Sequence, residues 1–199
     1  MLMPELWGMI LAAGESKRMK VPKLLLPYYG KTMIEKVIEN VSRSGINKIV
    51  VVLGSGRDGI MEVIRNLAVE TCFNPDYKLG MLSSIKCGFR SLPETSDSVL
   101  IFLGDQPMIR EQSVDEVIQA YNQSGKGIVI PVYKHKRGHP ILIDRRYRDE
   151  IEKLDDREGL RALAYKFAAD VYEVEVENDC ILRDIDTREE YINELNQIQ

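Results

Sequence analysis

The sequence has few cysteines, no excess of basic residues and no long apolar run. Its three cysteines, Cys72, Cys87 and Cys180, are widely spaced and show no C-x-x-C pattern, which argues against a disulfide framework and a zinc site. The formal net charge of −4 argues against duplex nucleic acid as a partner, because binding to the phosphate backbone usually requires a basic excess. No run approaches the roughly 18 apolar residues of a membrane-spanning helix, and no targeting segment is recognisable. We therefore expect a soluble protein of the reducing cytoplasm that binds neither nucleic acid nor membrane.

The length of 199 residues and the hydrophobic content of 44% are typical of one globular domain. We therefore expect a single domain over residues 1–199. Continuous apolar runs at 7–11, 48–53 and 98–103 are typical of buried strands in a parallel sheet. Segments with apolar residues at helical spacing lie between these runs, so the pattern predicts an α/β fold.

The segment 11–23, LAAGESKRMKVPK, directly follows the first apolar run. Small residues at 12–14 allow backbone N–H groups to approach a ligand closely, and Arg18 and Lys23 add two spaced cations. This combination favours polyanion binding, although a basic loop between a strand and a helix is also common in α/β proteins. Pro22 and Pro27 bracket Lys23 and predict an extended segment there.

A second glycine-rich segment follows the strand expected at 48–53. Gly54, Gly56 and Gly59 match the G-x-G-x-x-G pattern of dinucleotide-binding loops, with Glu70 or Asp76 as the acid that would bind the ribose. The pattern normally belongs to the first βαβ unit, whereas here it belongs to the second. We therefore favour a tight turn that requires positive φ over dinucleotide binding.

Three acids and two serines are further candidates for a site. Asp105 follows the strand expected at 98–103 and stands where open α/β sheets bind ligands, although an Asp before Pro is also a common turn former. Asp184 and Asp186 are two apart, and so lie on the same side of an extended chain. Ser83 and Ser84 open an expected helix, where they either cap it or face a polar ligand.

The remaining local signals concern helix starts, a basic hairpin and an edge strand. We expect capping boxes at three helix starts, and a solvent-exposed edge strand at 171–176, where acidic and apolar residues alternate. A basic hairpin at 134–138 lies between two strands, and His135 and His139 lack the partners of a zinc site. The three capping boxes pair Thr32 with Glu35, Ser113 with Glu116, and Thr187 with Glu190.

Six segments in the same order resemble the nucleotidyltransferases of molybdenum cofactor maturation, and most closely the molybdenum cofactor cytidylyltransferases. They are LAAGESKRM with PKLLLPYYGKTMIE at 11–35, NPDYKLGMLSSIKCG at 74–88, GDQP at 104–107, GHPILI at 138–143, DDREGLRAL at 155–163 and DIDTREEY at 184–191. The resemblance implies a Rossmann-like, open and mostly parallel sheet with helices on both faces. Lys20 stands where the family often has Gly, and Arg188 stands where it usually has Pro.

The resemblance also implies roles for individual residues. The loop Leu11, Ala12, Ala13 and Gly14, together with Arg18 and Lys23, would hold the nucleotide phosphates, and Ser84 would approach the base. Asp105 and Asp186 would coordinate Mg²⁺, with Asp105 also counted among the catalytic and nucleotide-binding residues. Guanylyl-transferring relatives tend to carry a second glycine at position 13, so Ala13 favours CTP over GTP.

These roles predict that the phosphate of molybdopterin, or of its molybdenum-loaded form, attacks the α-phosphorus of CTP and expels pyrophosphate. The resemblance implies that a molybdenum hydroxylase would receive the cofactor. Three alternatives remain open. They are an NAD(P)-linked oxidoreductase, a cytidylyltransferase acting on another phosphorylated small molecule, and a non-catalytic carrier of the molybdenum cofactor. Some relatives with the same motifs act on other substrates, including an oxidoreductase of nicotine blue.

Overall fold

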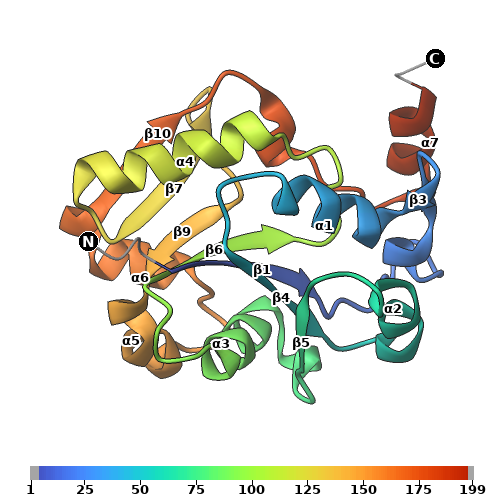
Figure 1. Ribbon diagram of the computed structural model, residues 1–199, viewed down its shortest axis with the longest axis horizontal. Coiled ribbons are helices and arrows are strands. Elements are labelled where there is room, and N and C mark those ends of the chain that lie inside the picture. The colour runs from blue at the N-terminus through green and yellow to red at the C-terminus, as the bar shows by residue number, and fades with distance from the viewer. Residues whose placement is uncertain (1–4, 197–199) are drawn as a thin grey trace.

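A central eight-stranded sheet organises the computed structural model, which describes residues 5–196 (Figure 1). The strand order is β10-β7-β9-β6-β1-β4-β5, and β8 pairs with β7. The strands are β1 (Leu6–Ala12), β4 (Lys48–Leu53), β5 (Glu70–Phe73), β6 (Ser98–Leu103), β7 (Ile128–Tyr133), β8 (Lys136–Arg137), β9 (Ile141–Asp144) and β10 (Val171–Glu175). A separate two-stranded ribbon is formed by β2 (Pro27–Tyr28) and β3 (Lys31–Thr32).

Helices cover both faces of the sheet, as expected of the predicted α/β class (Figure 1). On one face lie α1 (Met33–Ser42) and α4 (Glu111–Ser124), and on the other lie α3 (Met81–Ser91), α5 (Arg148–Lys153) and α6 (Arg161–Lys166). The helices α2 (Arg57–Ile64) and α7 (Arg188–Asn196) lie toward the right of Figure 1. The short 3₁₀ segments are Lys23–Leu25, Tyr77–Leu79, Arg145–Tyr147, Ala168–Asp170 and Asp179–Leu182.

The central strands are apolar throughout because both of their faces are covered. In β4, Ile49, Val51 and Leu53 pack with α1 in one core cluster, whereas Val50 and Val52 pack with α3 in the other. Successive side chains of a strand point to opposite faces, so a strand buried on both sides reads as a continuous apolar run. The open, mostly parallel sheet with helices on both faces confirms the predicted fold class.

The parallel pairing of β4, β1 and β6 brings three strand ends to one edge of the sheet. Ala12 aligns with Leu53, and Leu11 aligns with Leu103, so the loops after β1, β4 and β6 leave the sheet side by side. In an open α/β sheet this carboxyl edge is where ligands bind. The fold therefore places the segment 11–23, the glycine segment and Asp105 together.

The strands after β6 depart from a simple parallel order. β9 is antiparallel to both β6 and β7, while β10 pairs parallel with β7 and forms one edge of the sheet. The expected edge strand is confirmed there. The basic hairpin is also present, with its turn at Lys134 and His135, both at positive φ.

Two local predictions were wrong. The segment between Pro22 and Pro27 is not extended, because Lys23–Leu25 forms a 3₁₀ turn closed by the hydrogen bond from Leu26 N to Lys23 O. Ser113 does not cap α4, which already begins at Glu111. Its fully buried hydroxyl instead accepts a hydrogen bond from Asn178 Nδ2 at 3.1 Å.

The other two predicted capping boxes are present. Thr32 and Glu35 exchange both hydrogen bonds at the start of α1, and Thr187 and Glu190 do so at the start of α7.

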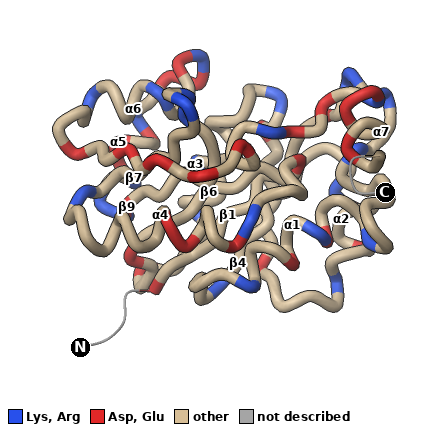
Figure 2. The backbone as a smooth tube through the Cα atoms, turned by 90° about the horizontal axis from the view of Figure 1, so that it is seen from above, with Lys and Arg blue, Asp and Glu red and all other residues tan. Residues whose placement is uncertain are grey.

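Acidic and basic residues are interspersed over the surface segments (Figure 2). In the described part of the chain, no helix combines the length and the apolarity needed to cross a membrane.

Candidate functional site

The loop after β1 is held against the glycine segment that follows β4. Ser55 N donates to Ala13 O at 3.1 Å, and a Cβ built on Gly54 would lie 2.7 Å from both the carbonyl oxygen and the Cβ of Ala13. Gly56 has a φ of 72° and confirms the predicted turn at positive φ. The close packing shows that a glycine is needed at position 54 to let the two loops touch.

Lys23 lies at the centre of the candidate site. Its backbone N–H donates to Ser16 Oγ at 3.2 Å, and its side chain is only 11% exposed. The Nζ atom lies 2.5 Å from Asp105 Oδ2 and 2.7 Å from Asp186 Oδ1. One ammonium group therefore joins two carboxylates that are far apart in the sequence.

Arg18 extends the same ion-pair network outward. Its guanidinium pairs with Asp186 Oδ2, while the side chain remains 67% exposed. The arginine therefore meets solvent at the mouth of the site, whereas Lys23 is enclosed. An entering anion would reach Arg18 first.

The two acid-bearing segments are tied together by the backbone. Asp105 follows β6 directly, and Ile185 N donates to Asp105 O at 2.9 Å. This bond holds Ile185 against Asp105, so that its chain neighbours Asp184 and Asp186 lie close to Asp105. The carboxylates of Asp105, Asp184 and Asp186 each offer an oxygen, and these oxygens lie within 4.8 Å of one another.

Opposing charges and burial set the protonation of this cluster. Burial lowers the pKa of Lys23, but Asp105 and Asp186 outweigh that effect and raise it above its usual value. Burial raises the pKa of Asp186, but the hydrogen bond and charge of Lys23 outweigh it, so this pKa is lowered. Asp184 lacks such a cation, and burial together with the charges of Asp186 and Asp105 raises its pKa.

The three acids fit a divalent cation. They supply oxygen ligands alone, which hard cations prefer; Asp105 and Asp186 are partly buried, and Asp184 is exposed. The Lys23 ammonium already pairs with two of the three carboxylates. A cation bound there would therefore compete with Lys23 for these carboxylates.

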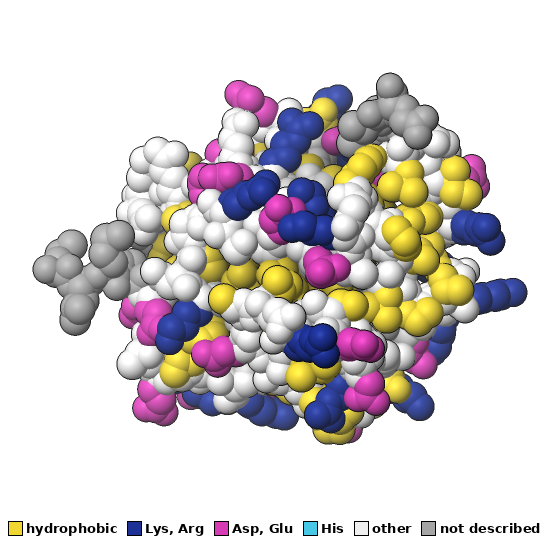
Figure 3. All heavy atoms as spheres, turned by 45° about the vertical axis from the view of Figure 1, so that its right-hand side comes forward, with side chains coloured by type: hydrophobic (Ala, Val, Ile, Leu, Met, Phe, Trp, Pro, Cys, Tyr) yellow, Lys and Arg dark blue, Asp and Glu magenta, His cyan; other side chains and the backbone are white. Residues whose placement is uncertain are grey.

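These groups line a cleft of about 460 Å³ at the carboxyl edge of the sheet. The volume is within the usual range for small-molecule sites. Figure 3 brings this side of the molecule forward and shows basic and acidic side chains next to one another, with hydrophobic side chains exposed nearby. The cleft is lined by Leu11, Ala13, Gly14, Glu15, Ser16, Lys17, Arg18, Lys23, Leu24, Tyr77, Gly80, Met81, Ser84, Leu103, Asp105, Asp184 and Asp186.

The structure brings eight of the nine candidate residues to this cleft. Ala12 is the exception, because its side chain is buried in the core beneath the loop. Ser84 lines the cleft and accepts a hydrogen bond from Asn74 Nδ2 at 3.0 Å. Neither serine makes a capping hydrogen bond to the helix, whose N-cap residue is Gly80.

Several lining residues were not assigned to the site from the sequence. Asp184 had a signal in its spacing from Asp186, and Ser16 and Lys17 lie within the basic loop itself. Tyr77 and Met81 had none, because nothing in the sequence indicates which residues of 74–88 face the cleft. The cysteines are free, as expected, although Cys72 Sγ and Cys87 Sγ lie 4.0 Å apart.

The family described as MobA-like NTP transferase domain matches residues 8–171. The bifunctional protein GlmU of Clostridium botulinum (strain Loch Maree / Type A3) is 35% identical over 121 residues, which cover 60% of this chain and 26% of that protein. The chain thus spans about a quarter of the length of such relatives. The nicotine blue oxidoreductase of Paenarthrobacter nicotinovorans is 29% identical over 160 residues, covering 75% of this chain and 76% of that protein.

Solved structures share the whole fold. The Rv0371c homologue from Mycobacterium sp. strain JC1 has a TM-score of 0.86 at 27% identity, covering 97% of this chain and 96% of that one. The manganese complex of Rv0371c from Mycobacterium tuberculosis H37Rv has a TM-score of 0.82 at 22% identity, with coverages of 98% and 100%. Molybdopterin-guanine dinucleotide biosynthesis protein A from Archaeoglobus fulgidus has a TM-score of 0.72 at 17% identity, with coverages of 97% and 100%. The last two likenesses concern the fold alone.

Proposed function

The chain belongs to the MobA-like NTP transferase family, and from this premise we propose that it is a nucleotidyltransferase that transfers CMP from CTP to the phosphate of molybdopterin or its molybdenum-loaded form. One observation carries the proposal. A half-buried cleft holds two cations, Arg18 and Lys23, directly against the carboxylates of Asp105 and Asp186. This arrangement suits a triphosphate accompanied by a divalent cation.

The proposed reaction needs no general base. A phosphate monoester has its second pKa near 6, so the attacking oxygen is already ionised at neutral pH. Attack forms a bond from that oxygen to the α-phosphorus, and the bond to the bridging oxygen breaks to release pyrophosphate. The main difficulty is to bring two polyanions together, so catalysis rests on positioning and charge neutralisation.

Lys23 and Arg18 suit different phosphates of the nucleotide because their side chains differ in exposure and shape. Lys23 is enclosed and presents a compact charge, which suits the α-phosphate oxygens, where charge shifts during displacement. Arg18 is exposed and presents a planar fork of donors, which suits the outer phosphates. Both cations must leave part of their pairing with carboxylates to do so.

Asp105 and Asp186, with Asp184 beside them, would hold Mg²⁺. When bound, this ion neutralises phosphate charge and frees Lys23 from the carboxylates that now hold it. The oxygen-only donor set supports Mg²⁺, and a related fold has been solved with manganese. The two ions prefer similar ligands, so both belong in the assay.

The choice of substrates comes from the resemblance and the loop residues. Ala13 lines the cleft where guanylyl-transferring relatives tend to have glycine, and this supports CTP. The motifs shared with cofactor cytidylyltransferases, and the fold shared with a molybdopterin-guanine dinucleotide biosynthesis protein, support molybdopterin as acceptor. A molybdenum hydroxylase would then receive the finished cofactor. A cytidylyltransferase for another phosphorylated small molecule would use the same residues.

A second candidate function is an NAD(P)-linked oxidoreductase. The likeness to nicotine blue oxidoreductase over three-quarters of both proteins favours it. Against it, Gly54 packs directly against Ala13, so this glycine serves the contact between the two loops. Calorimetry with NADPH and with CTP plus Mg²⁺ separates the two candidates, because each predicts binding of only one ligand.

The decisive assay measures pyrophosphate release from CTP, GTP, ATP and UTP with molybdopterin and Mg²⁺. We expect release with CTP, dependent on both the acceptor and the metal. Glu152→Gln on α5 removes an acid that pairs with Arg90, outside the cleft, and serves as the control for Asp105→Asn. Binding of molybdopterin without pyrophosphate release would indicate a carrier and would contradict the proposal.

A further inference from the structure

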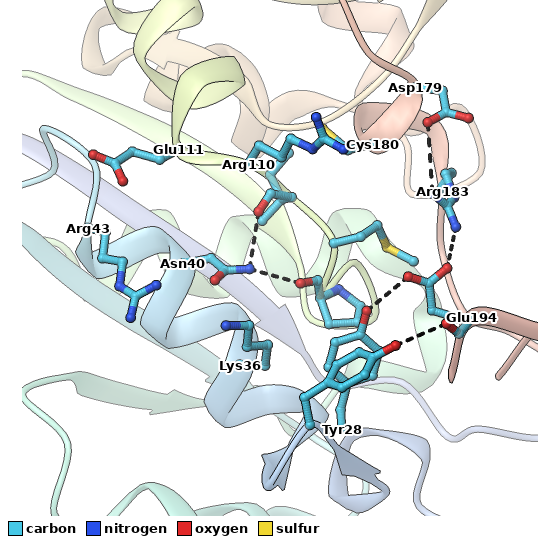
Figure 4. A pocket seen from close by; sticks show the side chains of 14 residues that line it. Tyr28, Lys36, Asn40, Arg43, Arg110, Glu111, Asp179, Cys180, Arg183 and Glu194 are labelled. Carbon is cyan, nitrogen blue, oxygen red and sulfur yellow. Dashed lines mark hydrogen bonds and ion pairs between the residues drawn. The ribbon is translucent and has the colours of Figure 1, made fainter. Parts of the chain in front are cut away.

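A second cavity of about 490 Å³ lies between α1, the segment after Asp105, the segment 179–183 and the last turn of α7 (Figure 4). None of its lining residues also lines the nucleotide cleft. Its volume is again within the range of small-molecule sites. It is lined by Tyr28, Tyr29, Lys36, Asn40, Arg43, Pro107, Met108, Ile109, Arg110, Glu111, Asp179, Cys180, Arg183 and Glu194.

One wall of the cavity is a polar face of α1. Lys36, Asn40 and Arg43 follow one another at helical spacing and lie on the same side of the helix (Figure 4). Lys36 and Arg43 both pair with Glu39, which also pairs with Lys31. Three cations thus share one carboxylate, and positive charge remains in excess along this wall.

The facing wall adds another cation. Arg110, next to α4, makes no ion pair or side-chain hydrogen bond within residues 5–196. Asn40 Nδ2 donates to Pro107 O at 2.8 Å and to Ile109 O at 3.1 Å, and so fixes the segment that carries Arg110 against α1. The three basic side chains therefore belong to one firmly joined frame.

The acids of the cavity do not neutralise these cations. Glu194 is 5% exposed and pairs with Arg183, and Asp179 lies 3.9 Å from the same guanidinium. Figure 4 shows the carboxylate of Glu111 turned away from Arg110. Lys36, Arg43 and Arg110 therefore give this cavity a local positive excess in a protein whose net charge is −4.

We infer that this cavity binds a small phosphate-bearing molecule as a second ligand, with Lys36 and Arg43 on α1 holding its phosphate and Arg110 on the opposite wall holding a second anionic group of the same ligand (Figure 4). Guanidinium and ammonium groups are the usual partners of phosphate, and Arg110 has no side-chain partner among residues 5–196 to give up. The exposed ring of Tyr29 and the partly buried side chain of Met108 provide surface for the rest of the ligand. The site differs from the nucleotide cleft in position and in every lining residue.

The walls of this cavity continue into the two acid-bearing segments. Pro107 follows Asp105 by two residues, and Arg183 directly precedes Asp184. Gln106 Nε2 donates to Ile181 O at 3.4 Å and links the two segments between cavity and cleft. A ligand that joins α1 to the segment at 107–110 would restrain Asp105, so its binding should lower the Mg²⁺ concentration needed for the proposed transfer severalfold. This last step rests on the proposed function, whereas the binding itself does not.

Binding is tested without nucleotide by methyl NMR. The ε-methyl group of Met108 reports this cavity and that of Met81 reports the nucleotide cleft. The chain is titrated with inorganic phosphate and with 3-phosphoglycerate. We expect a saturable shift of the Met108 signal, with tighter binding of 3-phosphoglycerate if the organic part also contacts the cavity.

Two variants and a control test the assignment of the cations. Arg110→Gln breaks no interaction within the described chain and should therefore fold normally. We expect this variant and Lys36→Gln each to weaken binding roughly tenfold. Lys153→Gln removes an exposed cation on α5, outside the cavity, and should not change the titration.

No saturable Met108 shift with either probe, or equal weakening by Lys153→Gln, would overturn the second site. A shift of Met81 alone would place the phosphate in the nucleotide cleft and would also overturn it. The coupling is then measured as the Mg²⁺ requirement of pyrophosphate release with and without 3-phosphoglycerate. An unchanged requirement would overturn the coupling, and absence of any release would count against the proposed function without touching the NMR result.

Discussion

The nucleotide cleft and the second cavity are both lined by cations, but these cations are paired with acids to different extents. In the cleft, Lys23 and Arg18 are paired with carboxylates that come from the far end of the chain. In the second cavity, Lys36 and Arg43 share a single carboxylate, and Arg110 has no partner in the described part of the chain. The cations of the cleft are therefore paired with acids of the same cleft, whereas the cavity keeps an excess of positive charge.

This difference indicates what each site needs from its ligand. The cavity can accept an anion without losing any ion pair at Arg110. In the cleft an anion must compete with Asp105 and Asp186 for Lys23, and a metal ion must compete with Lys23 for the same carboxylates. Binding of the anion and of the metal therefore favour each other, because each releases the partner that the other requires.

The largest effect is expected when Asp105 is replaced. Asp105→Asn keeps the shape but removes one charge from the metal-binding cluster, and should reduce metal-dependent turnover by a factor on the order of 10³ or more. Steady-state pyrophosphate release over a range of Mg²⁺ concentrations measures the loss, with circular dichroism to check the fold. Retained turnover with an unchanged metal dependence would exclude Asp105 as a metal ligand.

A smaller loss is expected at Lys23. Lys23→Ala should lower kcat by a factor on the order of 10²–10³ with a modest rise in KM for CTP, because a donor used mainly in the transition state affects turnover more than binding. The separate kcat and KM values test this. If the variant turned over normally, Lys23 would have no part in the transfer.

A pH effect is expected at His139, whose backbone N–H donates to Ile181 O between the two sites. Burial lowers its pKa from 6.5 to about 4, so the unfolded chain binds the proton more readily between these values. Stability should therefore fall as the pH drops from 6.5 to 4, by about 3 kcal/mol from this residue.

Urea unfolding of His139→Gln across that pH range measures this contribution. The variant should lose less stability on acidification than the original chain. His135→Gln replaces the other histidine, which is exposed at the hairpin turn, and should leave the pH dependence unchanged. Equal behaviour of both variants would contradict the assignment.

The smallest effect is expected at Arg18. Its side chain is 67% exposed, so solvent screens its charge, and Arg18→Gln should raise KM for CTP about tenfold with little change in kcat. Lys17→Gln is the control, since Lys17 is 78% exposed and pairs with Glu15 instead of the acid cluster. A dominant loss of kcat at Arg18 would show that it acts on the transition state.

The fold and the cleft were predictable where the signals are local or repeated. The buried strands were found because β1, β4 and β6 are apolar on both faces, and Arg18, Lys23, Asp105 and Asp186 were found from their motifs. Two local predictions were wrong because contacts with distant parts of the chain determine the structure there. Ser113 bonds to Asn178 instead of capping α4, and the segment after Pro22 forms a turn that encloses Lys23.

The second cavity had no signal in the sequence. Its walls come from five separate segments of the chain, and no motif indicates that they form one site. Its positive excess depends on Lys31, Lys36 and Arg43 all pairing with Glu39, and on Arg110 pairing with no acid among residues 5–196. Which basic side chain pairs with which acid can be read only from the folded structure.

The most direct test of the central claim follows the α-phosphorus itself. The chain is incubated with CTP labelled at the α-phosphorus, Mg²⁺ and molybdopterin, and the products are separated. We expect the label to appear in the pterin product together with an equal amount of pyrophosphate, and Asp105→Asn to abolish both. Label that stays in CTP, or that appears only as free CMP, would contradict it.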